Sequence, residues 1–431
     1  MELALTGFAL LLLLAFIGVP LAFATLFVGF FGLMYLRGLD AAMAVTSQWI
    51  VESSINYNLS IIPLFVLMGA FIHRSGISKD LFEASYAWFG RFRGGLALSG
   101  ILSCAGFAAV CGSSLATAAT MTRVAVPPMR SFRYNDGFSA GTIAAGGTLG
   151  IMIPPSVPLA IYGIVAGQDI GLLFIAGILP GVLMVCLFML AAIGVTTLRP
   201  DFGPAGEAKS LRDTLRASYS TWPVIILFGI VLGGIYSGIF TPTEAAGVGC
   251  AGAFLFGAFR GHFLDRASLW GVFEETVLTT AMIFAIVFSA LVLAQFVNLT
   301  GMPYELQSFV LGWGLGPVEL VLMICGICIL LGMVFESIGI LLLIIPVFLP
   351  SLASLGVDLI WFGILVIVVI ELGLITPPIG MNVFTVKSVA PEIPLGSIFL
   401  GVMPYIAAMV VAGILIILFP SIATFLPEAM R

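Results

Sequence analysis

A short phrase that occurs twice constrains this chain more than any other feature of its sequence. Residues 149–155 read LGIMIPP, and residues 372–378 read LGLITPP. The copies are 372 − 149 = 223 positions apart in a chain of 431 residues. Each copy ends in two prolines, and a proline removes an amide donor and clashes with the preceding helical turn. Both copies lie in apolar stretches, so we expect a helix break inside each of two membrane segments.

Helix breaks of this kind have a restricted use inside a membrane. They leave backbone carbonyls and amides unpaired, which bilayer depth tolerates only where those groups face protein or a water-filled cavity. Broken helices at corresponding places in two halves of a chain are a strong sequence indication of the binding site of a secondary transporter.

The composition indicates a membrane protein built of helices. Hydrophobic residues make up 61% of the chain and charged residues only 9%, whereas a typical soluble domain is about 25% charged. The 50 glycines suit helices that pack closely in lipid. We therefore predict an all-α polytopic membrane protein.

The repeated phrase belongs to a longer internal repeat. Further residues match across the two halves at nearly the same offset, with small gaps between them. The matched pairs are Pro20 with Pro242, Phe71 with Phe296, Gly76 with Gly301, Gly177 with Gly401 and Pro180 with Pro404. We predict a first repeat at residues 1–198, a linker on the cytoplasmic side at 199–221, and a second repeat at 222–431.

Each repeat is predicted to contain a re-entrant helical hairpin followed by a broken helix. In the first repeat the hairpin is expected at about 95–129 and the broken helix at about 140–168. In the second repeat the hairpin is expected at about 318–350 and the broken helix at about 359–386.

The positive charges indicate that the two repeats have inverted topology. Basic clusters flank the first hairpin on both sides and also fill the linker, whereas the flanks of the second hairpin, at 298–317 and 350–358, contain no Lys or Arg. The clusters are Arg74, Lys79, Arg91 and Arg93 in one loop, Arg130 and Arg133 after the hairpin, and Arg199, Lys209, Arg212 and Arg216 in the linker. Because positive charges accumulate on the cytoplasmic side, one hairpin is expected to enter from each face.

The start of the chain leaves two arrangements open. Residues 5–36 form either one kinked span or two short spans that break at Pro20. The repeat match to 222–259 favours two, which would place both chain ends outside. Residues 40–57 are too polar to cross the membrane and are predicted to lie at its interface.

The two predicted hairpin tips carry polar groups that suit ions. The first centres on residues 111–117 (CGSSLAT), and the second on 332–339 (GMVFESIG). Carbonyl and hydroxyl oxygens suit a hard cation, and helix N-termini suit a carboxylate. Glu336, an acidic residue at membrane depth, either balances a cation's charge or hydrogen-bonds the tip backbone. Glu371 either lies close to the second break or faces a helix interface.

The sequence does not favour an enzyme. Residues 137–141 match the hydrolase pattern G-x-S-x-G, but no strand precedes the serine. The two histidines, His73 and His262, are expected in loops. A G-x-G-x-x-G match at 247–252 lies in an apolar span without a strand–helix context. We predict neither catalysis, nor an organic cofactor, nor nucleic-acid binding.

Three motifs, in order along the chain, resemble the large membrane subunit of tripartite ATP-independent periplasmic (TRAP) transporters, the DctM-like permeases. They are GTLGIMIPPS at 147–156, GIFTPTEAA at 238–246 and ELGLITPPIGMN at 371–382. The resemblance implies an elevator-type, sodium-coupled importer in the bacterial inner membrane. It implies an organic acid delivered by a periplasmic substrate-binding protein, and a small four-helix membrane subunit as a separate chain.

The resemblance also implies sodium sites where each hairpin tip meets its broken helix. The first would be formed by Gly112, Ser113 and Ser114 with Gly147, Thr148 and Gly150. The second would be formed by Gly332, Glu336 and Ser337 with Thr376, Gly380 and Asn382. For the carboxylate of the substrate we expect Ser114, Thr148, Ser156 and Asn382, so three residues are expected at both kinds of site.

Two questions stay open from the sequence. A related two-hairpin sodium–dicarboxylate or anion symporter that works without a binding protein is the alternative function. The transported acid could be a C4-dicarboxylate, a keto acid, a sugar acid or a sialic acid, because all of them present a carboxylate to an amide-lined site.

Overall fold

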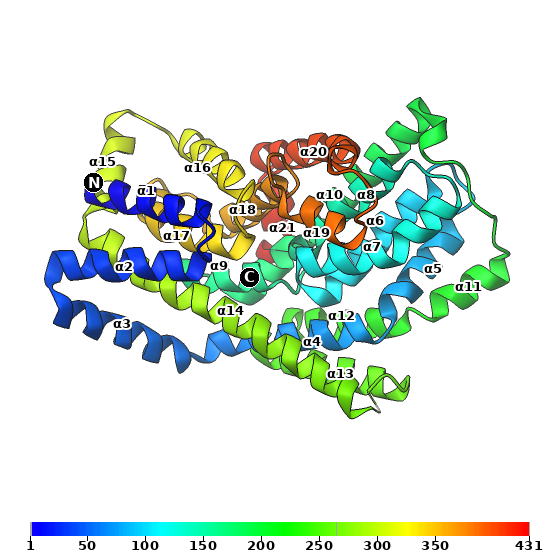
Figure 1. The fold of residues 1–431 in the computed structure, drawn as a ribbon, viewed down its shortest axis with the longest axis horizontal. Helices are drawn as coiled ribbons and strands as arrows, with labels where there is room; N and C mark the ends of the chain where they lie inside the picture. The colour runs from blue at the N-terminus through cyan, green and yellow to red at the C-terminus, as the bar shows by residue number, and fades with distance from the viewer. Residues whose placement is uncertain (1, 264, 431) are drawn as a thin grey trace.

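The computed structural model describes residues 2–263 and 265–430. Within these ranges every regular element is a helix, as the ribbon in Figure 1 shows. The prediction of an all-α protein is confirmed.

The helices of the first part of the chain include both expected devices, a hairpin (α6–α7) and a broken helix (α8–α9). In order they are α1 (Glu2–Phe16), α2 (Leu21–Arg37), α3 (Leu39–Ser54), η1 (Tyr57–Ser60), α4 (Ile61–Arg74), α5 (Ile77–Phe89), α6 (Gly95–Cys111), α7 (Ser114–Ser131), α8 (Asp136–Met152), α9 (Val157–Ala166), α10 (Ile170–Leu198), η2 (Pro200–Phe202) and α11 (Leu211–Tyr219).

The second part repeats these devices in α16–α17 and α18–α19. Its helices are α12 (Trp222–Tyr236), α13 (Pro242–Phe259), α14 (Arg266–Leu299), α15 (Met302–Gly312), α16 (Pro317–Gly332), α17 (Ser337–Ser354), α18 (Leu359–Leu374), α19 (Met381–Val389), α20 (Leu395–Leu418) and α21 (Ser421–Glu428). The predicted division falls between helices, because α10 ends at Leu198 and α12 begins at Trp222.

Several helices have the length and apolarity of a membrane span. Within the described residues there are five, or up to seven if each of the bent pairs α8–α9 and α11–α12 counts as one span. The five are Tyr57–Arg74, α10, α14, α17 and α20. One of them, α17, is an arm of a hairpin, so length alone does not distinguish a crossing helix from a re-entrant one.

The start of the chain forms two helices rather than one kinked span. α1 ends at Phe16 and α2 begins at Leu21, with Pro20 at the N-cap position. This is the arrangement that the internal repeat favours. The polar segment after it forms α3 and η1, and α3 packs against α2 and α14.

The hairpins and broken helices pack together as a central bundle, which we define as α6–α10 and α16–α20. Within it each hairpin packs against the broken helix of the other half: α7 contacts α19 of the second half, and α17 contacts α9 of the first. The two halves also meet where α8 packs against α20. The approach is so close that a Cβ at Gly401 would collide with the carbonyl oxygen of Gly137. Only glycine permits this approach of two backbones.

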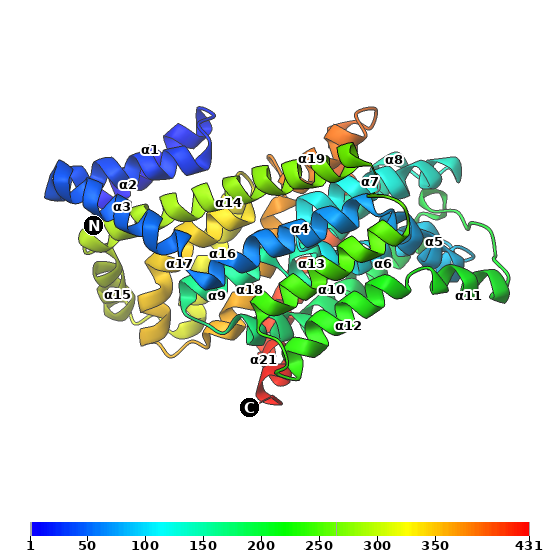
Figure 2. The ribbon, with the colours of Figure 1, turned by 90° about the horizontal axis from the view of Figure 1, so that it is seen from below.

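A layer formed by α2, α4, α13 and α14, which we call the outer layer, lies on one face of the central bundle. In it α14 packs against α2 and α4, and α4 packs against α13. Figure 2 shows α14, α4 and α13 running side by side across this face. The outer layer therefore presents α4 and α14 to the hairpins.

The segment 74–93, which we expected to be a single loop, contains α5. Its Ile77, Leu81 and Phe82 are buried, and α5 packs against α6. The expectation was wrong because Lys79 and Glu83, which form an exposed ion pair of 3.7 Å, lie on the opposite face of an amphipathic helix.

The linker after α10 lies against two loops of the central bundle. The amide of Gly94, before α6, donates to the carbonyl oxygen of Gly203 at 2.8 Å, and the amide of Asn135, before α8, donates to that of Phe202 at 3.2 Å. The segments that the positive charges assign to one side of the membrane therefore meet at one end of the bundle.

Candidate functional site

The first hairpin tip docks onto the first helix break. α6 ends at Cys111, Gly112 adopts φ +67°, and the hydroxyl of Ser113 caps α7 by accepting from the amide of Ala116 at 3.4 Å. A Cβ at Gly112 would lie 2.8 Å from the carbonyl oxygen of Pro155. The tip thus contacts the break between α8 and α9, a pair bent by 42°.

Two glycines on α8 allow α7 to begin directly against it. A Cβ at Gly147 would lie 3.1 Å from the carbonyl oxygen of Ser114, and one at Gly150 would collide with the carbonyl oxygen of Ser113. Most of the first predicted set is therefore in contact. Thr148 differs, because its hydroxyl donates to Ala145 within α8 at 2.6 Å.

The second tip docks onto the second break in the same manner. The amide of Gly380 donates to the carbonyl oxygen of Met333 at 3.2 Å. A Cβ at Gly332 would lie 2.9 Å from the Cα of Gly373. The hydroxyl of Thr376 donates back along α18 to Leu372 at 2.6 Å.

Glu336 occupies the N-cap position of α17 without making a capping hydrogen bond through its side chain. Its carboxylate lines a cavity together with Ser337. The structure thus gives the Glu336 side chain no capping hydrogen bond to the backbone of α17.

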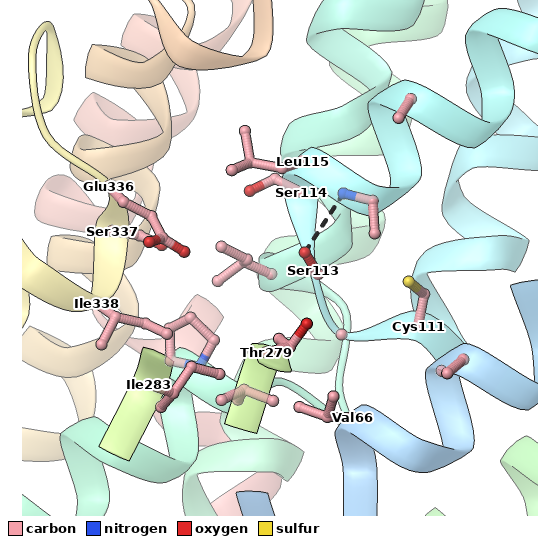
Figure 3. A pocket seen from close by; sticks show the side chains of 18 of the residues that line it. Val66, Cys111, Ser113, Ser114, Leu115, Thr279, Ile283, Glu336, Ser337 and Ile338 are labelled. Atoms are coloured by element: carbon pink, nitrogen blue, oxygen red, sulfur yellow. Dashed lines mark hydrogen bonds between the residues drawn. The ribbon is translucent and has the colours of Figure 1, made fainter. Parts of the chain in front are cut away.

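A cavity of about 270 Å³ lies between the two tips, and helices of the outer layer line part of it. Figure 3 shows Ser113 and Ser114 on one side of it and Glu336 and Ser337 on the other. Helix α4 contributes Val66, Gly69, Ala70 and His73, and α14 contributes Glu275, Thr279, Met282 and Ile283.

Charged and polar groups outside the predicted set also line this cavity. Arg123 on α7 is exposed and makes no ion pair within the described residues. Glu275 on α14 pairs with Arg74 at 3.2 Å. A hydrogen bond of 2.6 Å joins Nδ1 of His73 on α4 to the hydroxyl of Thr120 on α7, so it links the outer layer to the central bundle.

Sequence reasoning missed Arg123, His73 and Glu275. A signal for Arg123 was available, because an arginine inside a re-entrant hairpin is a costly charge at membrane depth. The expectation that His73 lies in a loop was wrong: His73 is in the last turn of α4. Glu275 carried no such signal, because the register of α14 against the hairpins depends on tertiary packing.

Glu371 lies at the interface between the halves and is fully buried. The hydroxyl of Ser114 donates to its Oε1 at 3.2 Å, while its Oε2 has no hydrogen-bond partner in the described structure. Glu371 therefore faces a helix interface and also lies beside a hairpin tip.

The four residues predicted to bind the substrate carboxylate are distributed unequally. Ser114 lines the cavity, whereas Thr148, Ser156 and Asn382 are fully buried behind its wall. The side-chain amide of Asn382 donates to the carbonyl oxygen of Ala144 at 3.4 Å, and its Oδ1 has no partner. Ser156 caps α9 by accepting from the amide of Leu159.

Comparison with known families identifies the class of protein. The model of the family described as "Tripartite ATP-independent periplasmic transporter, DctM component" matches residues 8–422. The chain belongs to this DctM family. The resemblance carried by the three sequence motifs is thereby confirmed.

Curated relatives of this DctM-family chain are similar over nearly their whole length. It is 35% identical over 381 residues to the C4-dicarboxylate TRAP transporter large permease protein DctM of Pseudomonas aeruginosa, covering 88% of both chains. It is 32% identical over 420 residues to the sialic acid TRAP transporter large permease protein SiaM of Vibrio cholerae, covering 96% of both. These relatives are transporter permeases and not enzymes.

A solved structure has the same fold. The Alcanivorax borkumensis YdaH transporter, whose topology is described as unusual, matches with a TM-score of 0.60 at 15% identity, covering 88% of this chain and 89% of that one. By its family the chain is a multi-pass, elevator-type permease and a component of a tripartite transporter, while this structural likeness shows the fold alone. The serine motif that resembled a hydrolase lies inside α8, where Ser139 is fully buried.

Proposed function

We propose that this chain is the large permease subunit of a sodium-coupled transporter that imports an organic acid across the bacterial inner membrane. A periplasmic substrate-binding protein would deliver the acid, and a small four-helix membrane subunit would complete the permease. The observation that carries the proposal is the cavity between the hairpin tips, because it combines hydroxyls, two helix N-termini and an unpaired guanidinium.

Arg123 would bind the carboxylate of the substrate. A guanidinium matches a carboxylate with two parallel hydrogen bonds, and Arg123 has no carboxylate partner in the described structure. The N-terminus of α7, which begins at Ser114, would add a favourable dipole for an anion. We therefore assign the substrate to the cavity face of α7.

Sodium ions would bind at the two hairpin tips. α6 and α16 end there, and the last carbonyls of a helix carry partial negative charge without intrahelical partners. The backbone and hydroxyl oxygens of the two predicted sets are hard ligands of the kind that such a cation prefers. Binding would order both tips around the cavity.

Sodium and substrate together would allow the central bundle to move. An elevator-type carrier slides its loaded domain against a scaffold, for which α4 and α14 of the outer layer are the candidates. An empty bundle would stay in place, because moving unpaired carbonyls and carboxylates past lipid is costly. Obligatory coupling follows from that cost.

The cavity suits a small acid. Its volume of about 270 Å³ is slightly smaller than that of typical ligand pockets, which span about 300–1,000 Å³. We infer a substrate of the C4-dicarboxylate, keto acid, sugar acid or sialic acid type, with selection among them shared with the binding protein.

Reconstitution tests the proposal. The chain and its small subunit would be placed in liposomes, and uptake of radiolabelled organic acids would be followed with an inward sodium gradient and candidate binding proteins. We expect uptake that requires both sodium and the binding protein. Uptake with sodium alone would favour the simpler symporter, and uptake indifferent to sodium would refute the coupling.

A further inference from the structure

Only the second repeat carries acidic residues at its hairpin tip and helix break. Glu336 of the second half lies opposite Gly112 of the first, since 336 − 112 = 224. Glu371 lies opposite Thr148, since 371 − 148 = 223. The second half therefore carries two carboxylates where the first half carries none, although both halves present a tip of the same construction.

The tertiary structure brings one of these carboxylates to the first tip. Glu371 is on α18, and its Oε1 accepts the hydrogen bond of Ser114, the first residue of α7. The N-terminus of α7 thus points its partial positive charge towards a carboxylate of the other half. The tip without an acidic residue obtains one across the interface between the repeats.

The surroundings of Glu371 do not compensate the negative charge of an ionised carboxylate. Its side chain is fully buried and its Oε2 accepts no hydrogen bond, an arrangement that disfavours the ionised carboxylate unless a cation compensates it. A second carboxylate, that of Glu336, lines the adjoining cavity. Two neighbouring carboxylates increase the demand for a cation.

The protein's own basic groups do not meet that demand. Of the helices that pack along α18, only α19 carries a described Lys or Arg, namely Lys387, whereas α7 meets α18 at Ser114 and carries Arg123 and Arg130 further along. The ammonium group of Lys387 donates to the carbonyl oxygens of Pro391 and Ile393 beyond the end of α19. Arg123 lies nine residues after Ser114, about 13 Å further along α7.

A second buried acceptor without a donor lies on α19, the other arm of the same broken helix. Oδ1 of Asn382 has no partner, while the amide of the same side chain donates to Ala144. Ala144 is one helical turn before Gly147 on α8, and Gly147 lies against the carbonyl oxygen of Ser114. These pairwise contacts link α7, α8, α18 and α19 through carboxylate, amide and hydroxyl oxygens, which are the ligands that hard cations prefer.

The cavity gives a cation a short approach to Glu371. Ser114 lines the cavity and contacts Glu371 behind it, and Leu374, one turn further along α18, also lines the cavity. Ser114 therefore touches both the cavity and the buried carboxylate.

We propose that Glu371 is the carboxylate ligand of the sodium ion at the first hairpin tip, with the hydroxyl of Ser114 as its neighbour. This assignment rests on the proposed sodium coupling. The second half supplies the negative charge for the site of the first, so an ion bound there joins α7 to α18. Sodium at one tip then stabilises both halves at once.

Sodium-dependent thermal stability tests the assignment without a transport assay. The purified permease with its small subunit is heated in increasing NaCl, with KCl keeping the ionic strength constant, because a ligand that binds only the folded state raises the melting temperature. We expect Glu371→Gln to melt near the wild type in KCl and to show a clearly smaller sodium-dependent rise, because the ion at the second tip still binds while the first site needs at least about tenfold more sodium, as for groups that support a metal ion.

Two further variants separate a ligand from a merely structural residue. Glu371→Asp keeps the charge and is expected to retain a weakened sodium response, even if the glutamine variant folds poorly. Glu392→Gln changes an exposed carboxylate outside the cavity and is expected to respond like the wild type. A wild-type response in Glu371→Gln, or no response in a folded Glu371→Asp with a normal response in Glu392→Gln, would overturn the assignment as stated. A wild-type protein that does not respond to sodium would overturn both this site and the coupling.

Discussion

Ser114, at the start of α7, donates a hydrogen bond of 3.2 Å to Glu371 on α18. The two residues are 257 positions apart and belong to different repeats. The bond joins the tip of one hairpin to the broken helix of the other half. It therefore connects the first predicted ion site to the broken helix that carries part of the second.

Arg123→Gln is predicted to impair substrate binding while leaving sodium binding intact. The glutamine keeps a polar side chain in the cavity but removes the charge that a carboxylate would pair with, and charged hydrogen bonds contribute about 1.5–3 kcal/mol. We expect the KM for the acid to rise at least about tenfold in reconstituted uptake. Arg91→Gln, at an exposed arginine in the loop before α6, is the matched control. An unchanged KM in Arg123→Gln would exclude this residue from the substrate site.

Ser113→Ala and Ser337→Ala are predicted to lower sodium affinity more than folding stability. Each serine lies at a hairpin tip, and loss of the cap by Ser113 costs about 1 kcal/mol. The sodium concentration for half-maximal uptake is expected to rise severalfold in both variants, with a small decrease in melting temperature measured in KCl. Unchanged sodium dependence in both would contradict the assignment of sodium to the tips.

Gly401→Ala is predicted to destabilise the folded protein by about 1–3 kcal/mol through overpacking. The added methyl group would collide with the carbonyl oxygen of Gly137, where α20 crosses α8. Gly413→Ala is the control on the same helix, because a Cβ there meets nothing within 4 Å and alanine is the better helix former by about 1 kcal/mol. Melting temperatures are expected to move in opposite directions, and a fall of equal size in both would refute the packing argument.

Thr120→Val is predicted to raise the maximal rate of uptake. The hydroxyl of Thr120 bonds to His73 across the boundary between the central bundle and the outer layer, so it stabilises the present arrangement of the two. Its loss removes about 1 kcal/mol, which corresponds to an increase of up to about fivefold if the bundle must slide past α4.

Thr122→Val is the control for this prediction, because the hydroxyl of Thr122 bonds only to Ala118 within α7. Initial rates at saturating substrate and sodium provide the measurement. Equal rates in wild type and Thr120→Val would show that this bond does not restrain the movement.

Local rules account for most of the architecture. A proline pair must break a helix, and a glycine at positive φ can end one, so the breaks and the first hairpin tip could be located from the sequence alone. The prediction of a loop at residues 74–93 failed because the segment forms the amphipathic helix α5. Its charged residues drew attention away from the buried Ile77, Leu81 and Phe82. The many charges were interpreted as a loop, because the sequence does not show that one face of this segment packs against α6.

The sequence by itself determined the fold class, the number of hairpins and breaks, and the family, since these depend on apolar length, proline and glycine positions and ordered motifs. Only the tertiary structure decided which residues share the cavity. Arg123, His73 and Glu275 meet there because α4 and α14 pack across the tips. Glu371 contacts Ser114 because helices of the two halves pack against each other in the central bundle. Contacts between residues hundreds of positions apart depend on how helices cross, and helical periodicity within one segment carries no information about that crossing.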